Sequence, residues 1–127
     1  MNDKELLTLA AKAYWGDEIN DVCSIRWLDK DECIGYTHGD NQDYNGRDVE
    51  LCWNPLEWDH DALRLAVKLR LRVLTPTSDT DVAIASCGDV RGTAHVHQYS
   101  EDEYTDPYAA TRRAIVRAAA AIGKDMP

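Results

Sequence analysis

Two adjacent arginines and three aromatic residues are the side chains best suited to binding a ligand. Arg112 and Arg113 follow Tyr108 near the start of an expected helix. The positive end of a helix dipole and two guanidinium groups together attract anions such as phosphates. Trp53 and Trp58 add aromatic surface that can line a pocket or contact a partner. These five residues form the candidate ligand-binding set.

Two other interpretations compete with this set. The arginines follow acidic residues at positions 101–103, and we favour ion pairs with these over a bound anion. The tryptophans flank the start of another expected helix, where aromatic anchors more often belong to the core. A nucleotide-like ligand held by the five residues is therefore a hypothesis with a structural alternative.

His95 and His97 are two residues apart on an expected strand, so their imidazoles share one face, as some metal sites require. A third ligand from Cys87, His38 or an acidic residue is not fixed by the sequence. Exposed strand histidines explain the pattern more simply. We therefore expect no metal or other cofactor, and a metal-dependent enzyme is the weakest of the hypotheses.

Residues 38–48, HGDNQDYNGRD, are expected to form a long polar loop of the kind that is functional or mobile. Asp40, Asn41, Asp43 and Asn45 resemble an oxygen-rich calcium loop. The glycine and the terminal glutamate of such a loop are out of register, so calcium is not expected.

The four cysteines, Cys23, Cys33, Cys52 and Cys87, form no CxxC pair. The N-terminal residues are acidic and amphipathic, which does not resemble a secretion signal and indicates the reducing cytoplasm. We therefore expect four free, buried thiols. A four-thiolate zinc site has no spacing signature to support it.

Catalytic motifs are not found in the sequence. It contains no Gly-rich phosphate loop, no nucleophile elbow and no HExxH. Four cysteines and four histidines always allow some Cys/His pair to be chosen, so such a pair is weak evidence for a nucleophile without a motif. Pairs of carboxylates are equally weak evidence, because the chain is rich in acidic residues. We therefore expect a protein that is not an enzyme.

The net charge of −9 is concentrated in the first half of the chain. Residues 1–60 contain 14 acidic and 5 basic residues, whereas residues 61–127 contain 9 of each. A protein that binds nucleic-acid backbones needs a basic surface, so this class is excluded. A basic protein partner is compatible with the acidic half, but we favour simple solubility as the explanation.

The length of 127 residues predicts a single domain, 1–127, with one hydrophobic core. No apolar run approaches the ~20 residues that cross a bilayer. We therefore expect a cytoplasmic protein that does not contact a membrane.

Hydrophobic periodicity and turn residues predict three helices and five to six strands. The helices are expected at 3–15, capped by Asn2 or Asp3 and ended by Gly16, at 60–69, capped by Asp59, and at 107–122, capped by Asp106 and ended by Gly123. The strands are expected at 22–27, 32–36, 49–53, 71–74, 81–86 and 93–99, with a turn at 87–92 between the last two.

The helix at 60–69 is the expected centre of the fold. More than half of its circumference is covered by apolar side chains, namely Ala62, Leu63, Leu65, Ala66, Val67 and Leu69. A surface helix carries an apolar stripe about 100° wide, so this helix is expected to be covered on two sides. By contrast, the alanines of the helix at 107–122 form a narrow stripe that lets its backbone approach a sheet or a second copy of the chain.

The order of elements indicates an α+β fold, in which an antiparallel or mixed sheet of about five to six strands is packed by three helices. Two segments add a resemblance. The central signature of the phage ABA sandwich domain resembles WNPL at 53–56 followed by DALRLAVKL at 61–69. The C-terminal helix of that domain resembles DPYAATRRAIVRAAA at 106–120. Arg70 stands where that family often has a glycine, so we expect a differently built turn there.

The resemblance implies an α-β-α layered sandwich and an origin in a phage or prophage, and it supplies no catalytic residues. The leading hypothesis is an accessory protein that binds a host or phage macromolecule, most simply a protein, in the bacterial cytoplasm. A small-ligand binder that sequesters a nucleotide-like host signal is the alternative, and homo-oligomerisation is compatible with both.

Overall fold

The computed structural model describes residues 2–16, 22–77, 80–96 and 106–127. Within these ranges the chain is α+β, as expected, with three helices and six strands. The helices are α1 (Asp3–Trp15), α2 (Asp59–Lys68) and α3 (Pro107–Asp125). The strands are β1 (Val22–Leu28), β2 (Cys33–Gln42), β3 (Asp48–Trp53), β4 (Arg72–Leu74), β5 (Val82–Cys87) and β6 (Val90–His95).

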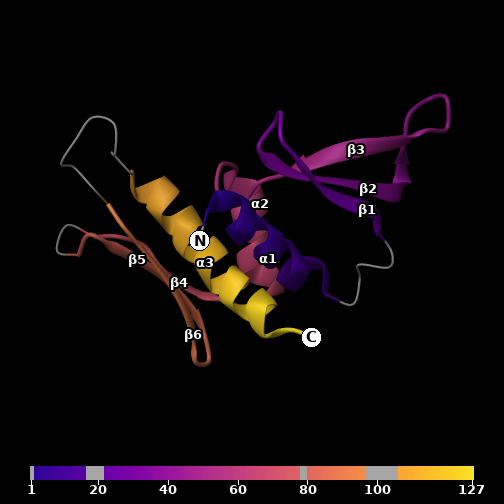
Figure 1. Ribbon diagram of the computed structural model, residues 1–127. Helices are drawn as coiled ribbons and strands as arrows, with labels where there is room; N and C mark the ends of the chain where they lie inside the picture. The colour runs from indigo at the N-terminus through magenta and orange to yellow at the C-terminus, as the bar shows by residue number, and fades with distance from the viewer. Residues whose placement is uncertain (1, 17–21, 78–79, 97–105) are drawn as a thin grey trace.

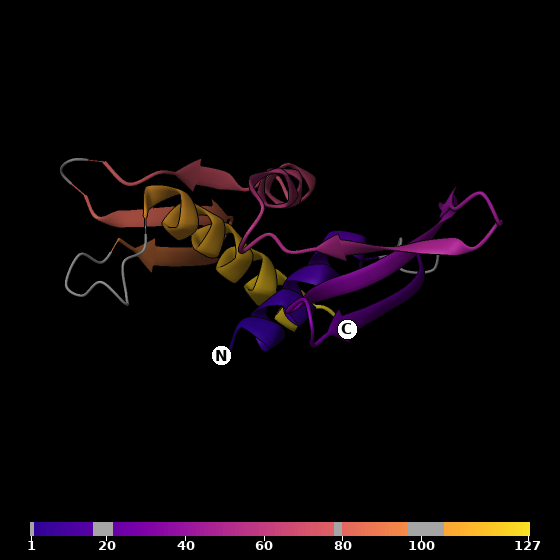
Figure 2. The same ribbon diagram turned by 90° about the horizontal axis from the view of Figure 1, so that it is seen from above.

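The six strands form two antiparallel sheets instead of the single sheet that was expected. Sheet A has the order β1-β2-β3 and sheet B the order β4-β5-β6. Helices α1 and α3 lie between the two sheets, with α3 on sheet B and α1 next to β2 (Figure 1). Seen from above, sheet A extends away from the rest of the molecule (Figure 2). An α-β-α order of layers is therefore not confirmed.

Helix α3 is the central helix of this fold. It contacts β5 and β6 on one side and α1 on the other. Ala114 and Ala118 are completely buried, and Gly92 of β6 lies against their backbone so closely that a Cβ atom at Gly92 would collide with the Ala114 carbonyl. The alanine stripe thus brings α3 close to sheet B, as its composition predicts, and is not available for pairing with a second copy.

Helix α2 is not covered on two sides, and the expectation that it forms the centre of the fold is wrong. Leu65 is fully buried, but Leu63 and Val67 are 65 and 69 % exposed. The reason is that α2 packs mainly on α3, and the described part of the chain provides no second layer over its other apolar side.

The turn after α2 adopts the backbone conformation that a glycine favours. Arg70 has a φ of 55°, in the left-handed region. The Arg70 N–H donates to the Val67 carbonyl and the Leu71 N–H to the Ala66 carbonyl, which ends the helix in a Schellman-like turn. The arginine therefore does not change the type of turn, contrary to expectation.

The helix caps are predicted well, with two exceptions. Asn2 and Asp106 accept N–H bonds from Glu5 and Ala109, as expected. At α2, however, Trp58 and not Asp59 occupies the N-cap and makes no side-chain cap bond. Helix α3 continues past Gly123 to Asp125, and the absence of a side chain at Gly123 leaves room for the α1 backbone at Leu9.

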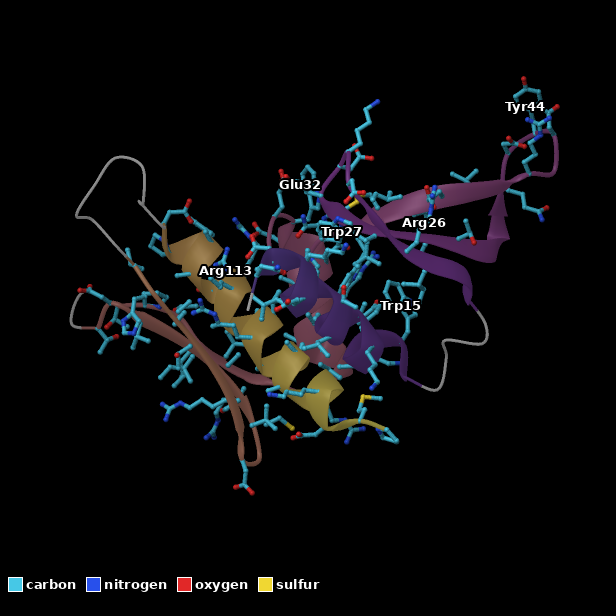
Figure 3. All side chains as sticks on the ribbon, in the orientation of Figure 1. Trp15, Arg26, Trp27, Glu32, Tyr44 and Arg113 are labelled. Carbon is cyan, nitrogen blue, oxygen red and sulfur yellow. A yellow bond between two sulfur atoms is a disulfide. The ribbon has the colours of Figure 1, made fainter. Side chains whose placement is uncertain are left out.

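Two expected loops are shorter in the structure. Residues 38–42 belong to β2 and Asp48 begins β3, and after a register shift Gln42 pairs with Asp48. Tyr44 lies at the tip of this hairpin, far from the helices (Figure 3). The expected turn at 87–92 contains only two residues, because Cys87 pairs directly with Val90.

The expectation of four free thiols is also wrong. Cys33 and Cys52, on the neighbouring strands β2 and β3, form a disulfide. Their spacing of 19 residues gave no motif, and only the register of the hairpin brings them together. Cys87 is free, as expected, but exposed instead of buried, and the side chain of Cys23 lies outside the described part.

Candidate functional site

Trp53 does not belong to a binding site, because it is a core residue. It is only 2 % exposed, and its ring lies 5.4 Å from that of Tyr14 and 5.2 Å from that of Trp15. Tyr36 completes this aromatic cluster, which joins α1 to sheet A. Burial raises the pKa of the Tyr36 hydroxyl, and the nearby Asp61 carboxylate adds to the shift. The core interpretation of Trp53 is confirmed.

Arg112 and Arg113 make ion pairs, but with partners other than the expected ones. Arg112 Nη1 donates to Asp59 at 2.7 Å and its Nε to the Leu56 carbonyl at 2.9 Å. Arg113 Nη1 donates to Asp3 at 3.1 Å. The acidic residues 101–103 lie outside the described residues. Both guanidinium groups are thus committed to holding α2 and α1 against α3.

Arg117 continues this row along α3 and also has a structural role. Its Nη1 donates to the Thr93 carbonyl of β6 at 2.6 Å. Burial, and then repulsion from Arg113, lower the pKa of the Arg117 guanidinium, whereas Asp3 opposes the shift. The three arginines therefore connect α3 to its neighbours, Arg112 and Arg113 through ion pairs and Arg117 through a backbone carbonyl.

A polar cleft of about 750 Å³ contains both predicted arginines. It lies between α1, the β1–β2 turn and α3, and acidic side chains such as Glu32 and Glu57 surround it. With Arg112 and Arg113 already neutralised, this cleft does not favour a nucleotide-like anion.

The second cavity is an apolar groove between α2, β4 and the first half of α3, with a volume of about 440 Å³. We call it the α2 groove. Its lining includes the buried Ala62, Ala66 and Ile115 and, at its margin, the exposed Leu63 and Tyr108. Of the five predicted site residues, only Tyr108 and Arg112 line this groove, while Trp58 stays about half exposed at the start of α2.

An exposed apolar surface continues from the groove along α2. Leu63, Val67 and Tyr108 are 65, 69 and 71 % exposed. Side chains of these sizes together present roughly 400 Å², which is comparable to the largest apolar patch of a typical monomer and is often functional. The sequence contained part of the signal for this surface, namely apolar residues on two sides of one short helix.

The metal sites that were weighed as weaker alternatives find no support among the residues that the structure describes. No group of three or more histidine, cysteine or acidic residues there could hold a metal ion. Asp43 instead holds the tip of the β2–β3 hairpin, since its carboxylate accepts N–H bonds from Asn45 and Arg47. His97 lies outside the described residues, so the structure does not test the weaker hypothesis of a metal site at His95 and His97.

No protein family, curated protein or solved structure matches this chain. Among the described residues, no helix has the length and apolar character needed to span a membrane. The α2 groove and the apolar surface beside it are therefore the features from which a function is inferred.

Proposed function

We propose that this chain is an accessory protein of a phage or prophage that acts by binding another protein through the α2 groove, in the cytoplasm of the bacterial host. The phage origin, and a place in the ABA sandwich family, are supported by the two resembling segments, 53–69 and 106–120. The binding activity is supported by the exposed surface itself.

The single observation that carries the proposal is the exposure of Leu63 and Val67 beside an apolar groove. Each such side chain contributes about 1.5–3 kcal/mol when it passes from water into a packed interface. A monomer would be more soluble with polar residues at both positions, and neither residue supports the core. The surface therefore fits a contact that is completed by a partner.

Affinity capture from a lysate of the natural host tests this proposal. The tagged chain should retain a stoichiometric protein, and Leu63→Asp combined with Val67→Asp should release it. Tyr44→Asp is the matched control, because Tyr44 is 97 % exposed but lies at the far end of sheet A. Retention of the same protein by the groove variant would refute a role of the groove.

A small apolar ligand is the second candidate, because the groove volume falls within the usual range of ligand pockets, about 300–1,000 Å³. Native mass spectrometry of the protein purified from host cells distinguishes the two. A retained small molecule that Leu63→Asp removes would favour the ligand over the protein partner.

A further inference from the structure

Another apolar groove lies between α1 and β1, the edge strand of sheet A. We call it the β1 groove. Thr8 and Ala11 of α1 form one wall, Ile25 and Trp27 of β1 form the other, and the buried Ile34 of β2 also lines it. Its volume of about 430 Å³ falls within the usual range of ligand pockets, about 300–1,000 Å³. The lining residues of the β1 groove and of the α2 groove are entirely different, so the two are separate places on the molecule.

The charged residues that line the β1 groove are basic, although the first half of the chain is strongly acidic. Residues 1–60 contain 14 acidic and 5 basic residues. Three of the basic ones, Lys4, Lys12 and Arg26, line the groove, and no acidic residue of the described part does. Arg26 is already neutralised, because its Nε and Nη2 each donate to the Glu50 carboxylate at 2.9 Å. The uncompensated charge in the groove is therefore that of the two lysines.

The two lysines differ in how far they are engaged. Neither has a carboxylate within ion-pair distance among the described residues. Lys12 Nζ donates to the Met126 carbonyl at 2.9 Å, which fixes its position without cancelling its charge. Lys4 Nζ lies 6.0 Å from the centre of the Trp27 ring, at the outer limit of a cation–π contact. An anion in the groove can therefore pair with Lys4 without displacing an existing ion pair.

The arrangement of apolar and charged groups defines the kind of ligand. Ile25 and Trp27 point to the face of sheet A opposite that of Arg26, because side chains alternate along a strand. They provide an apolar wall beside α1, where Trp27 lies next to the helix (Figure 3). The eight residues from Lys4 to Lys12 span about 12 Å of helix. A ligand that matches this groove has one extended apolar chain and one negative charge at its end.

We infer that the β1 groove binds a free medium-chain carboxylate, which is a function beyond the protein binding proposed for the α2 groove. The alkyl chain lies along Ala11, Ile25 and Trp27, and the carboxylate pairs with Lys4. Burial of the chain provides most of the affinity, since each buried methylene is favourable and the groove wall is apolar. The ion pair with Lys4 distinguishes an anionic ligand from a neutral or cationic one of the same length.

Three ligands with the same chain test the inference directly. Decanoate, decanamide and decylamine carry a negative, a neutral and a positive head group at pH 7, and isothermal titration calorimetry measures the binding of each below its micellar concentration. Decanoate should bind about three- to fivefold more tightly than decanamide, as expected for one exposed ion pair. Decylamine should bind most weakly. The preference for decanoate should shrink as salt is raised, because salt screens exposed charges.

Variants of the protein assign the binding to the β1 groove. Lys4→Gln should remove the preference for decanoate and leave the binding of decanamide unchanged. Lys30→Gln is the matched control, because Lys30 is also exposed but lies in the β1–β2 turn outside the groove, and it should keep the preference. Thr8→Trp places an indole in the groove from an exposed position of α1 and should weaken all three ligands at least tenfold. Circular dichroism confirms that each variant is folded.

Equal binding of decanoate and decanamide, or a preference that persists in Lys4→Gln, would overturn the inference. Absence of binding by all three ligands would do the same. Loss of decanoate binding in Leu63→Asp would place the ligand in the α2 groove instead. Binding to phosphatidylglycerol vesicles without binding of free decanoate would assign the β1 groove to a membrane surface. The capture of a protein through the α2 groove does not depend on any of these results, so the inference and the proposed function can fail separately.

Discussion

The two leucines of α2 provide the sharpest test of how this helix is placed. Leu65 is fully buried, whereas Leu63 is 65 % exposed, although the sequence makes both look equally suited to a core. Truncation of a buried leucine to alanine costs about 3–4 kcal/mol, the sum of lost burial and a residual cavity. At Leu63 only about a third of the side chain is covered, so Leu63→Ala should cost about 0.5–1 kcal/mol.

Urea denaturation followed by tryptophan fluorescence measures the free energy of unfolding of the Leu63→Ala and Leu65→Ala variants. Because the two substitutions are the same and lie in the same helix, the change in helix propensity cancels in the comparison. Leu65→Ala should therefore be less stable than Leu63→Ala by about 2–3 kcal/mol, with similar m-values. Equal losses would mean that Leu63 is covered in the folded protein, and the α2 groove would then not be an open surface.

Three further outcomes are expected. Gly92→Ala should destabilise the fold by about 3 kcal/mol in the same assay, because the new Cβ collides with the Ala114 carbonyl of α3. Reduction of the Cys33–Cys52 disulfide should lower the free energy of unfolding by about 3 kcal/mol, since it closes a loop of 19 residues; thermal melts with and without reductant measure this. Burial raises the pKa of Tyr36 above its usual 10.0, so its contribution to stability is present below that value and is lost as pH rises through the folded-state pKa. Melts in alkaline buffer should show a smaller loss for Tyr36→Phe than for the unaltered chain.

Local signals predicted most elements of the fold. The caps at Asn2 and Asp106 depend on residues within one turn and are correct. The strand expected at 81–86 is β5, with bounds that differ by one residue at each end. In contrast, the division of the strands into two sheets depends on contacts between distant segments, which periodicity does not encode. The same reason explains why the Cys33–Cys52 bond was missed.

The candidate site was predicted less well than the fold. Residue type correctly identified Arg112 and Arg113 as members of ion pairs, but their partners, Asp59 and Asp3, are far away in the sequence. The exposure of Leu63 was missed because a helical wheel shows which residues share a side, and not which side the rest of the chain covers.

Photo-crosslinking at the groove tests the central claim most directly. Benzoylphenylalanine replaces Leu63 in one variant and Tyr44 in another, and each is irradiated in host cells. We predict a crosslink to one partner protein at position 63, and none to that protein at position 44. The prediction would be contradicted if position 63 crosslinks only to a second copy of the chain. It would also be contradicted if both positions crosslink to the same proteins.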